Sequence, residues 1–202
     1  MSNLIITCHV EPLRKKEDIT YLDKFFLDIG TFDFPIIYLL MHGEKAGDRI
    51  LSRFNKNKAF GLHVHGDTRE ALATYKKYFG QYPRDISYGH WNLNTEGLKF
   101  AAKCGVRNDY SYTAYRNKEH YFFKEPYMLN GIREYPSTCD PTVPLSPIVY
   151  WKHLILFLMM LPVVKINKQL VMHFSFHSYD LHADFLSKLR WQIVKLYINV
   201  LK

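Results

Sequence analysis

Short apolar runs alternate with amphipathic segments along most of the chain. An apolar run of four to eight residues is typical of a strand buried on both faces, whereas apolar residues three and four positions apart indicate a helix. We predict strands at residues 3–10, 34–41, 60–65, 85–88, 106–112, 131–135 and 169–176, and helices at residues 16–30, 45–54, 68–79, 94–104 and from 179 or 181 to the end. This alternation predicts an α/β protein with a parallel sheet covered by helices.

Two regions depart from this alternation. Residues 113–146 are rich in tyrosine, contain prolines and show little periodicity, so we expect an irregular segment around the strand at 131–135. Residues 147–164 are the most hydrophobic stretch, but Lys152, His153 and Pro162 interrupt it. Because a membrane-spanning helix needs about 20 nearly uncharged residues, we predict a buried helix there and no membrane span.

Length and composition indicate one globular domain over residues 1–202, with 48% apolar residues and a formal net charge of +8. Lysine and arginine are spread along the chain without a dense basic tract or a known nucleic-acid motif, so nucleic-acid binding is not expected. The positive charge is consistent with a solvated basic surface, and it would also favour a phosphate-bearing carbohydrate as substrate. The three cysteines form no CxxC pair, and the first residues lack the pattern of a secretory signal, which together predict a cytoplasmic protein.

Candidate chemistry is concentrated where the predicted strands end, which is where parallel α/β sheets gather functional groups. Within residues 59–69, His63 and His65 alternate with apolar residues and therefore project from one face of a strand. Other strand ends carry Glu11, His42, His90 and His177. Paired imidazoles suit Zn²⁺ or a similar divalent ion, which needs about three protein ligands and an open position for catalysis. The sequence therefore predicts a metal site at this edge of the sheet.

Five short motifs occur in a characteristic order: CHVE at 8–11, GLHVH at 61–65, SYGHW at 87–91, NGIREYP at 130–136 and HFSFHSYDL at 173–181. In this order and spacing the chain resembles a divergent member of the polysaccharide deacetylase (NodB-like) superfamily. The resemblance implies a distorted (β/α) barrel of about seven strands that holds a divalent metal, usually zinc. It also implies hydrolytic removal of N- or O-acetyl groups from sugars.

The resemblance assigns roles to individual residues. Glu11 matches the metal-binding acid of the family, and His63 and His65 match its metal-binding histidine pair. His177 matches the histidine that acts as general acid. His9 stands where family members carry an aspartate as catalytic base, and the histidine pair is spaced by one residue where members often have three. His9 is thus the candidate base, with the role of a fourth metal ligand as the alternative.

The remaining candidates are assigned to the substrate pocket or to the core. We expect His42, His90 and Trp91 to line the sugar site, and His173 to be buried and hydrogen-bonded. The leading prediction is a metal-dependent deacetylase acting on an acetylated carbohydrate in cell-surface polysaccharide biosynthesis. One alternative is a sugar-binding protein without catalysis, suggested by His9. Another is a metal-dependent phosphoesterase or amidohydrolase, although those families usually carry the His-x-His pattern on the first strand.

Overall fold

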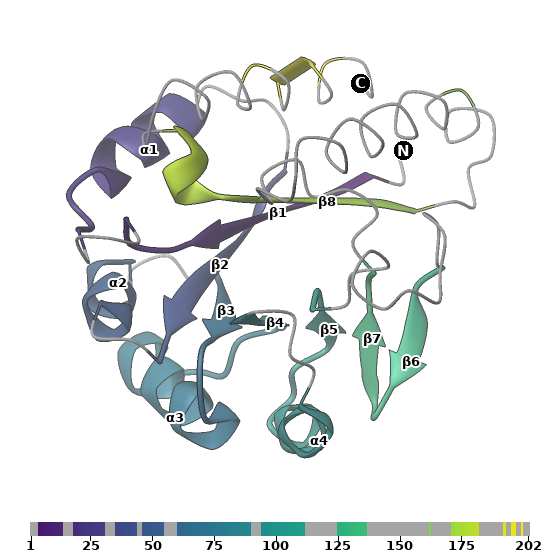
Figure 1. The fold of residues 1–202 in the computed structure, drawn as a ribbon. Coiled ribbons are helices and arrows are strands. Elements are labelled where there is room, and N and C mark those ends of the chain that lie inside the picture. Colours follow the sequence, from purple (N-terminus) through teal and green to yellow (C-terminus); the bar gives the residue numbers. More distant parts are fainter. Residues whose placement is uncertain are drawn as a thin grey trace.

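A single curled sheet of eight strands forms the centre of the structure, a computed structural model (Figure 1). The structure describes residues 4–13, 18–30, 35–43, 46–54, 60–89, 94–111, 125–136 and 171–181, and the single residues 162, 192, 195, 196 and 199. The strands are β1 (Leu4–Val10), β2 (Ile37–His42), β3 (Gly61–Val64), β4 (Asp85–Tyr88), β5 (Asn108–Asp109), β6 (Tyr127–Leu129), β7 (Ile132–Glu134) and β8 (Met172–His177). The helices are α1 (Leu22–Ile29), α2 (Gly47–Phe54), α3 (Thr68–Phe79), α4 (Thr95–Lys103) and the 3₁₀ helix η2 (Ser178–Leu181).

The strands follow the order β6-β7-β5-β4-β3-β2-β1-β8. Neighbouring strands are parallel except β6 and β7, which form an antiparallel pair. In Figure 1 the sheet curves into a half-barrel, with α1 to α4 on its outer side. Within the described residues, β6 and β8 do not pair, so the barrel is open. The sequence led us to expect about seven strands; the additional strand, β6, lies in a stretch that was predicted to be irregular.

Most predicted elements are present, with the boundaries set by local chemistry. Residues 68–79 and 85–88 match α3 and β4 to the residue. The predicted helix at 16–30 begins only at Leu22, because Leu13 pairs with Asp18 and the Asp18 carboxylate accepts a hydrogen bond from the Thr20 amide. None of the described helices is long and apolar enough to cross a membrane. The predicted helices at 147–164 and near the end of the chain lie outside the described residues, apart from single positions.

The two faces of the sheet carry different residues. Leu40, Leu62 and Ile86 are in register on neighbouring strands and pack in the hydrophobic core on the helix side. Successive residues of a strand point to opposite faces, so His63, in register with Met41, points to the concave side. The apolar core therefore fixes the sheet from outside and leaves the inner strand ends to polar groups.

The chain segments that follow β2 and β3 approach each other so closely that one of them requires a glycine. The His65 amide donates to the His42 carbonyl oxygen at 2.7 Å, and next to it Gly43 has φ +105°. A Cβ at Gly43 would overlap the His65 carbonyl group. We expect Gly43→Ala to lower the free energy of unfolding by about 2 kcal/mol or more, because backbone strain and steric overlap act together.

Gly80→Ala is the matched control in denaturant titrations of this prediction. Gly80 also has a positive φ, +74°, but its Cβ would meet nothing within 4 Å. Replacing Gly80 by alanine should lower the free energy of unfolding by about 1 kcal/mol, since only the backbone conformation is unfavourable for alanine there. Equal losses of stability in the two variants would show that the close approach of His65 to Gly43 is unimportant.

Candidate metal centre and active site

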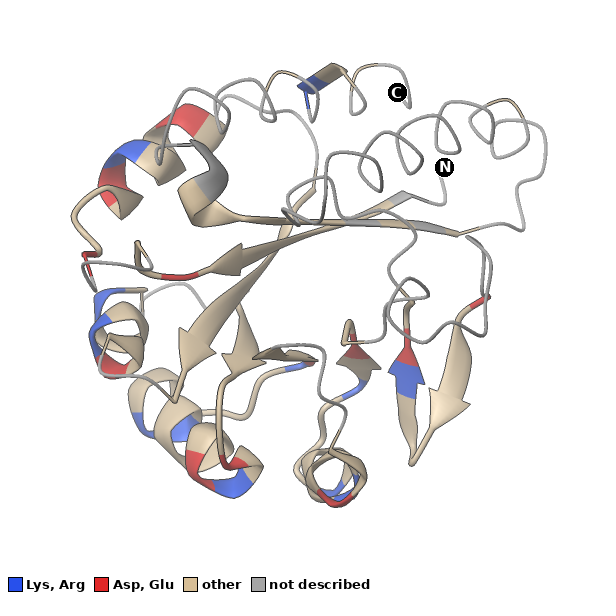
Figure 2. Cartoon of the chain, viewed as in Figure 1, with Lys and Arg blue, Asp and Glu red and all other residues tan. Residues whose placement is uncertain are grey.

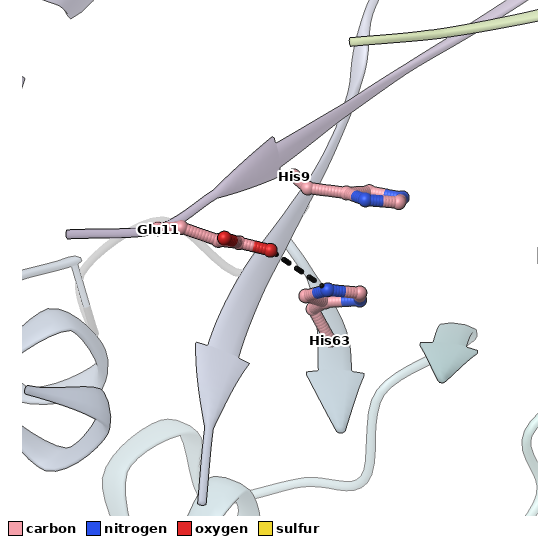
Figure 3. A group of neighbouring side chains, drawn as sticks. All are labelled: His9, Glu11 and His63. Carbon is pink, nitrogen blue, oxygen red and sulfur yellow. Dashed lines mark hydrogen bonds and ion pairs between the residues drawn. The ribbon is translucent and has the colours of Figure 1, made fainter. Parts of the chain in front are cut away.

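Glu11 is the centre of a buried group of histidines at the inner end of β1. Its carboxylate oxygen Oε1 lies 3.0 Å from Nε2 of His63, 3.6 Å from Nε2 of His65 and 3.7 Å from Nε2 of His177. Glu11 is 6% exposed, and Figure 3 shows its side chain pointing toward His63. Side chains from the residue after β1, from β3 and the turn after it, and from the end of β8 thus meet at one point.

The backbone of Glu11 is held in place by hydrogen bonds from other elements. The hydroxyl group of Tyr21, next to α1, donates to the Glu11 carbonyl oxygen. The Glu11 amide donates to the hydroxyl oxygen of Ser178 at 3.1 Å, and the two hydroxyl groups lie 2.6 Å apart. Ser178 directly follows β8, so the same residue that fixes Glu11 also fixes the end of the strand that carries His177.

His9 belongs to the same cluster. Its ring is stacked on that of His63, with 4.2 Å between the ring centroids (Figure 3). It also meets the His177 ring edge-on, with 5.1 Å between the centroids. Among the described residues, His9, Glu11 and His63 form the group whose potential ligand atoms all lie within 4.8 Å of one another. The residue predicted as a base therefore lies within reach of a metal bound by Glu11 and His63.

Burial and neighbouring charges set the protonation states of this cluster. Burial favours a raised pKa for Glu11, but the charge of His177 and hydrogen bonds from His63 and His65 outweigh it, so the pKa lies well below its ordinary value. Burial lowers the pKa of His63 to about 4, against the opposing effect of Glu11. Burial also lowers the pKa of His9 well below its usual range. At neutral pH the carboxylate is charged and these two imidazoles are neutral.

The donor set fits a divalent metal ion. Ligand atoms bound to one tetrahedral ion at roughly 2.0–2.2 Å lie about 3.4 Å apart, which is close to the separations found around Glu11. An ionised carboxylate and neutral imidazoles are also the states in which these side chains bind metals.

The other predicted site residues have different surroundings. His42 ends β2 and lines a cleft together with His65. His173 is 1% exposed and hydrogen-bonds through Nε2 to the Thr7 hydroxyl and through Nδ1 to the Tyr135 carbonyl oxygen, each at 2.8 Å. This pairing gives His173 the structural environment expected from the sequence. His90 and Trp91 lie outside the described residues.

Sequence reasoning missed a buried pair of carboxyl groups on β5 and β7. Asp109 and Glu134 are in register on these strands, are 1% and 0% exposed, and hydrogen-bond to each other. Burial raises the pKa of Asp109 to about 6. Asp109 is also in register with Ile86 of the helix-side core, so this pair faces away from the histidines. Asp109 and Glu134 each lie within a strand that the sequence predicts. An acidic residue in such a position is unusual, and this signal could have identified both residues as candidates.

No protein-family model matches this chain, and neither does any curated protein. Among solved structures, the fold resembles a protein from Bordetella bronchiseptica assigned as a polysaccharide deacetylase involved in O-antigen biosynthesis, at 10% identity, with a TM-score of 0.52 and coverage of 98% of this chain and 82% of that one. It also resembles a protein from Mycobacterium smegmatis assigned as a polysaccharide deacetylase, at 10% identity, with a TM-score of 0.55 and coverage of 96% and 84%.

A third similar structure belongs to a different class of carbohydrate enzyme. It is a GH57-type branching enzyme from Pyrococcus horikoshii, at 10% identity, with a TM-score of 0.53 and coverage of 94% of this chain and 66% of that one. At such low identity these likenesses show the fold alone. The chain thus has a fold found in proteins assigned as polysaccharide deacetylases and in a GH57-type branching enzyme, which supports the NodB-like fold implied by the sequence motifs.

Proposed function

We propose that this protein is a metal-dependent hydrolase that removes an acetyl group from a sugar or a polysaccharide intermediate. The observation that carries the proposal is the placement of the Glu11 carboxylate within 3.7 Å of Nε2 of three histidines, two at the end of β3 and one at the end of β8. The fold found in proteins assigned as polysaccharide deacetylases supports it. The His-x-His pattern lies on the third strand, which disfavours a phosphoesterase or amidohydrolase.

In this proposal Glu11, His63 and His65 hold the metal ion, and zinc is the ion that best suits one carboxylate and two imidazoles. Such an ion, when bound, activates water as a nucleophile near neutral pH and polarises a carbonyl group. Neutral His9 would act as the base that takes up the proton lost by the attacking water. His177, at the end of β8, gives a proton to the departing amine or alkoxide.

A second candidate function rests on His9. Its burial lowers its pKa well below the ordinary value, which weakens it as a base, and its position among the potential ligands suits metal binding instead. A chain with a ligand in place of the usual base would bind an acetylated sugar without hydrolysing it. The two candidates therefore share the metal site and the substrate class, and differ in turnover.

The proposed pathway is cell-surface polysaccharide biosynthesis. It is suggested by the similar structure assigned to O-antigen biosynthesis, which is one such process. A cytoplasmic location and the absence of nucleic-acid binding stay predictions from the sequence.

Acetate release is the direct test of the proposed function. We expect the purified, zinc-supplied protein to release acetate from an N-acetylated or O-acetylated sugar or oligosaccharide, to lose this activity with a chelator and to regain it with zinc. Sugar binding without acetate release across such a set would favour the binding protein. A protein that binds no metal even after reconstitution would exclude the proposed hydrolase.

A further inference from the structure

An acidic cleft adjoins the candidate metal centre. It has a volume of about 290 Å³ and is lined by His42, Asp48, His65, Asp67 and Glu70, with two glycines between them. His65 belongs to both sites, because its Nε2 lies 3.6 Å from the Glu11 carboxylate while the residue also lines the cleft. The cleft and the candidate metal centre therefore meet at His65.

The charge of the cleft is opposite to that of the protein. The net charge is +8, and Figure 2 shows lysine and arginine chiefly on the helices and connections, yet among the described residues neither type lines the cleft. Asp48 and Glu70 lie in the first turns of α2 and α3 and are exposed to solvent. Asp67 differs, because its carboxylate already accepts the amides of Arg69 and Glu70 as the cap of α3. Asp48 and Glu70 are thus the two carboxylates available to a ligand.

His42 gives an independent sign that a polar ligand binds here. The residue is 5% exposed and lines the cleft, its Nε2 lies 4.0 Å from a carboxylate oxygen of Asp48, and its Nδ1 has no hydrogen-bond partner among the described residues. A buried ring nitrogen without a partner is costly, and native structures normally satisfy such a group with water or a ligand.

The spacing of the donors distinguishes an organic cation from a metal ion. Within the described chain, only His9, Glu11 and His63 bring three potential ligand atoms within 4.8 Å of one another. Among the described residues no such group includes Asp48 or Glu70, and the three N–H groups of an ammonium can reach acceptors that lie farther apart. The volume lies near the lower end of the usual range for ligand pockets, roughly 300–1,000 Å³, and suits one sugar ring.

We propose that this cleft is a subsite for an amino sugar with a free, protonated amine, bound by Asp48 and Glu70 next to the acetylated unit at the metal centre. The identity of the ligand as a sugar rests on the proposed function. The substrate would then be a partly deacetylated amino-sugar oligomer.

The test compares two disaccharides that differ at the amine and carry no acetyl group, so that neither can be deacetylated. Calorimetric titration would measure binding of the β-1,4-linked disaccharide of glucosamine and of cellobiose, which has hydroxyl groups in place of the amines. We expect the amino disaccharide to bind about three- to tenfold more tightly, since each exposed ion pair contributes modestly, and to lose this advantage at high salt.

The variant Asp48→Asn/Glu70→Gln should bind the two disaccharides about equally. Glu96→Gln is the matched control, because Glu96 is an exposed acid in the first turn of α4 and does not line the cleft. It should keep the preference of the unmodified protein. Equal affinities in the unmodified protein, or a preference that survives in the double variant, would overturn the proposal.

Two further outcomes separate this inference from neighbouring hypotheses. A second equivalent of zinc that binds the unmodified protein and is lost in the Asp48→Asn/Glu70→Gln variant would assign the cleft to a metal and overturn the proposal. A preference for the amino disaccharide in a protein that never releases acetate would support the subsite and remove the deacetylase. Acetate release by a protein that shows no preference for the amino disaccharide would support the deacetylase and overturn the proposed subsite.

Discussion

Replacing both His63 and His65 by alanine is expected to weaken metal binding by more than about 100-fold, so that the purified variant retains almost none of the zinc that the unmodified protein binds. Loss of a residue that merely supports a ligand typically costs roughly 10- to 100-fold in affinity, and here two ligands are removed at once. Nε2 of each histidine lies within 3.6 Å of the Glu11 carboxylate, so the variant leaves that buried acid with fewer donors. Elemental analysis of the two purified proteins would measure the effect.

Two additional variants keep this prediction testable if the double variant folds poorly. His65→Asn removes only the more exposed ligand and should still lower zinc content. His42→Ala is the control, since His42 ends a neighbouring strand but lines the acidic cleft, and it should bind as much zinc as the unmodified protein. Equal zinc content in all variants, with circular dichroism showing intact folds, would refute the proposed ligand set.

The second large effect is expected for His177→Gln, which should lower kcat for acetate release by about 10²- to 10⁴-fold while zinc content stays unchanged. General acid catalysis contributes on this scale, and glutamine cannot supply a proton to the leaving group. His177 is held for this task by the end of β8, by stacking on Tyr179 and by its position 3.7 Å from Glu11. Steady-state kinetics on an N-acetylated substrate would measure the loss.

The leaving group provides the control for His177. An aryl acetate ester releases a phenolate that needs little protonation, so His177→Gln should slow its hydrolysis far less than that of an amide. A structural role would slow both reactions alike. Loss of zinc from His177→Gln would instead make His177 a ligand and contradict its assignment as the acid.

The amino-acid sequence by itself determined most of the local structure and part of the site. Asp67 caps α3 by accepting two backbone amides and Gly80 ends it in the left-handed conformation, so both ends of that helix are encoded locally. Strand periodicity placed His63 and His65 on one face, because successive side chains alternate regardless of what surrounds the strand. The rule that functional groups collect at the ends of parallel strands added Glu11, His42, His90 and His177 as candidates, and the family resemblance then gave roles to Glu11 and His177.

Only the tertiary structure decided how these groups meet. Pairing of β1 with β8 places His9 in register with His177, and the distance of His9 from Glu11 and His63 makes it a potential ligand as well as a candidate base. The Asp109–Glu134 pair likewise depends on the pairing of β5 with β7. Such contacts join residues far apart in the sequence, and they depend on which strands become neighbours in the sheet, which no local pattern along the chain specifies.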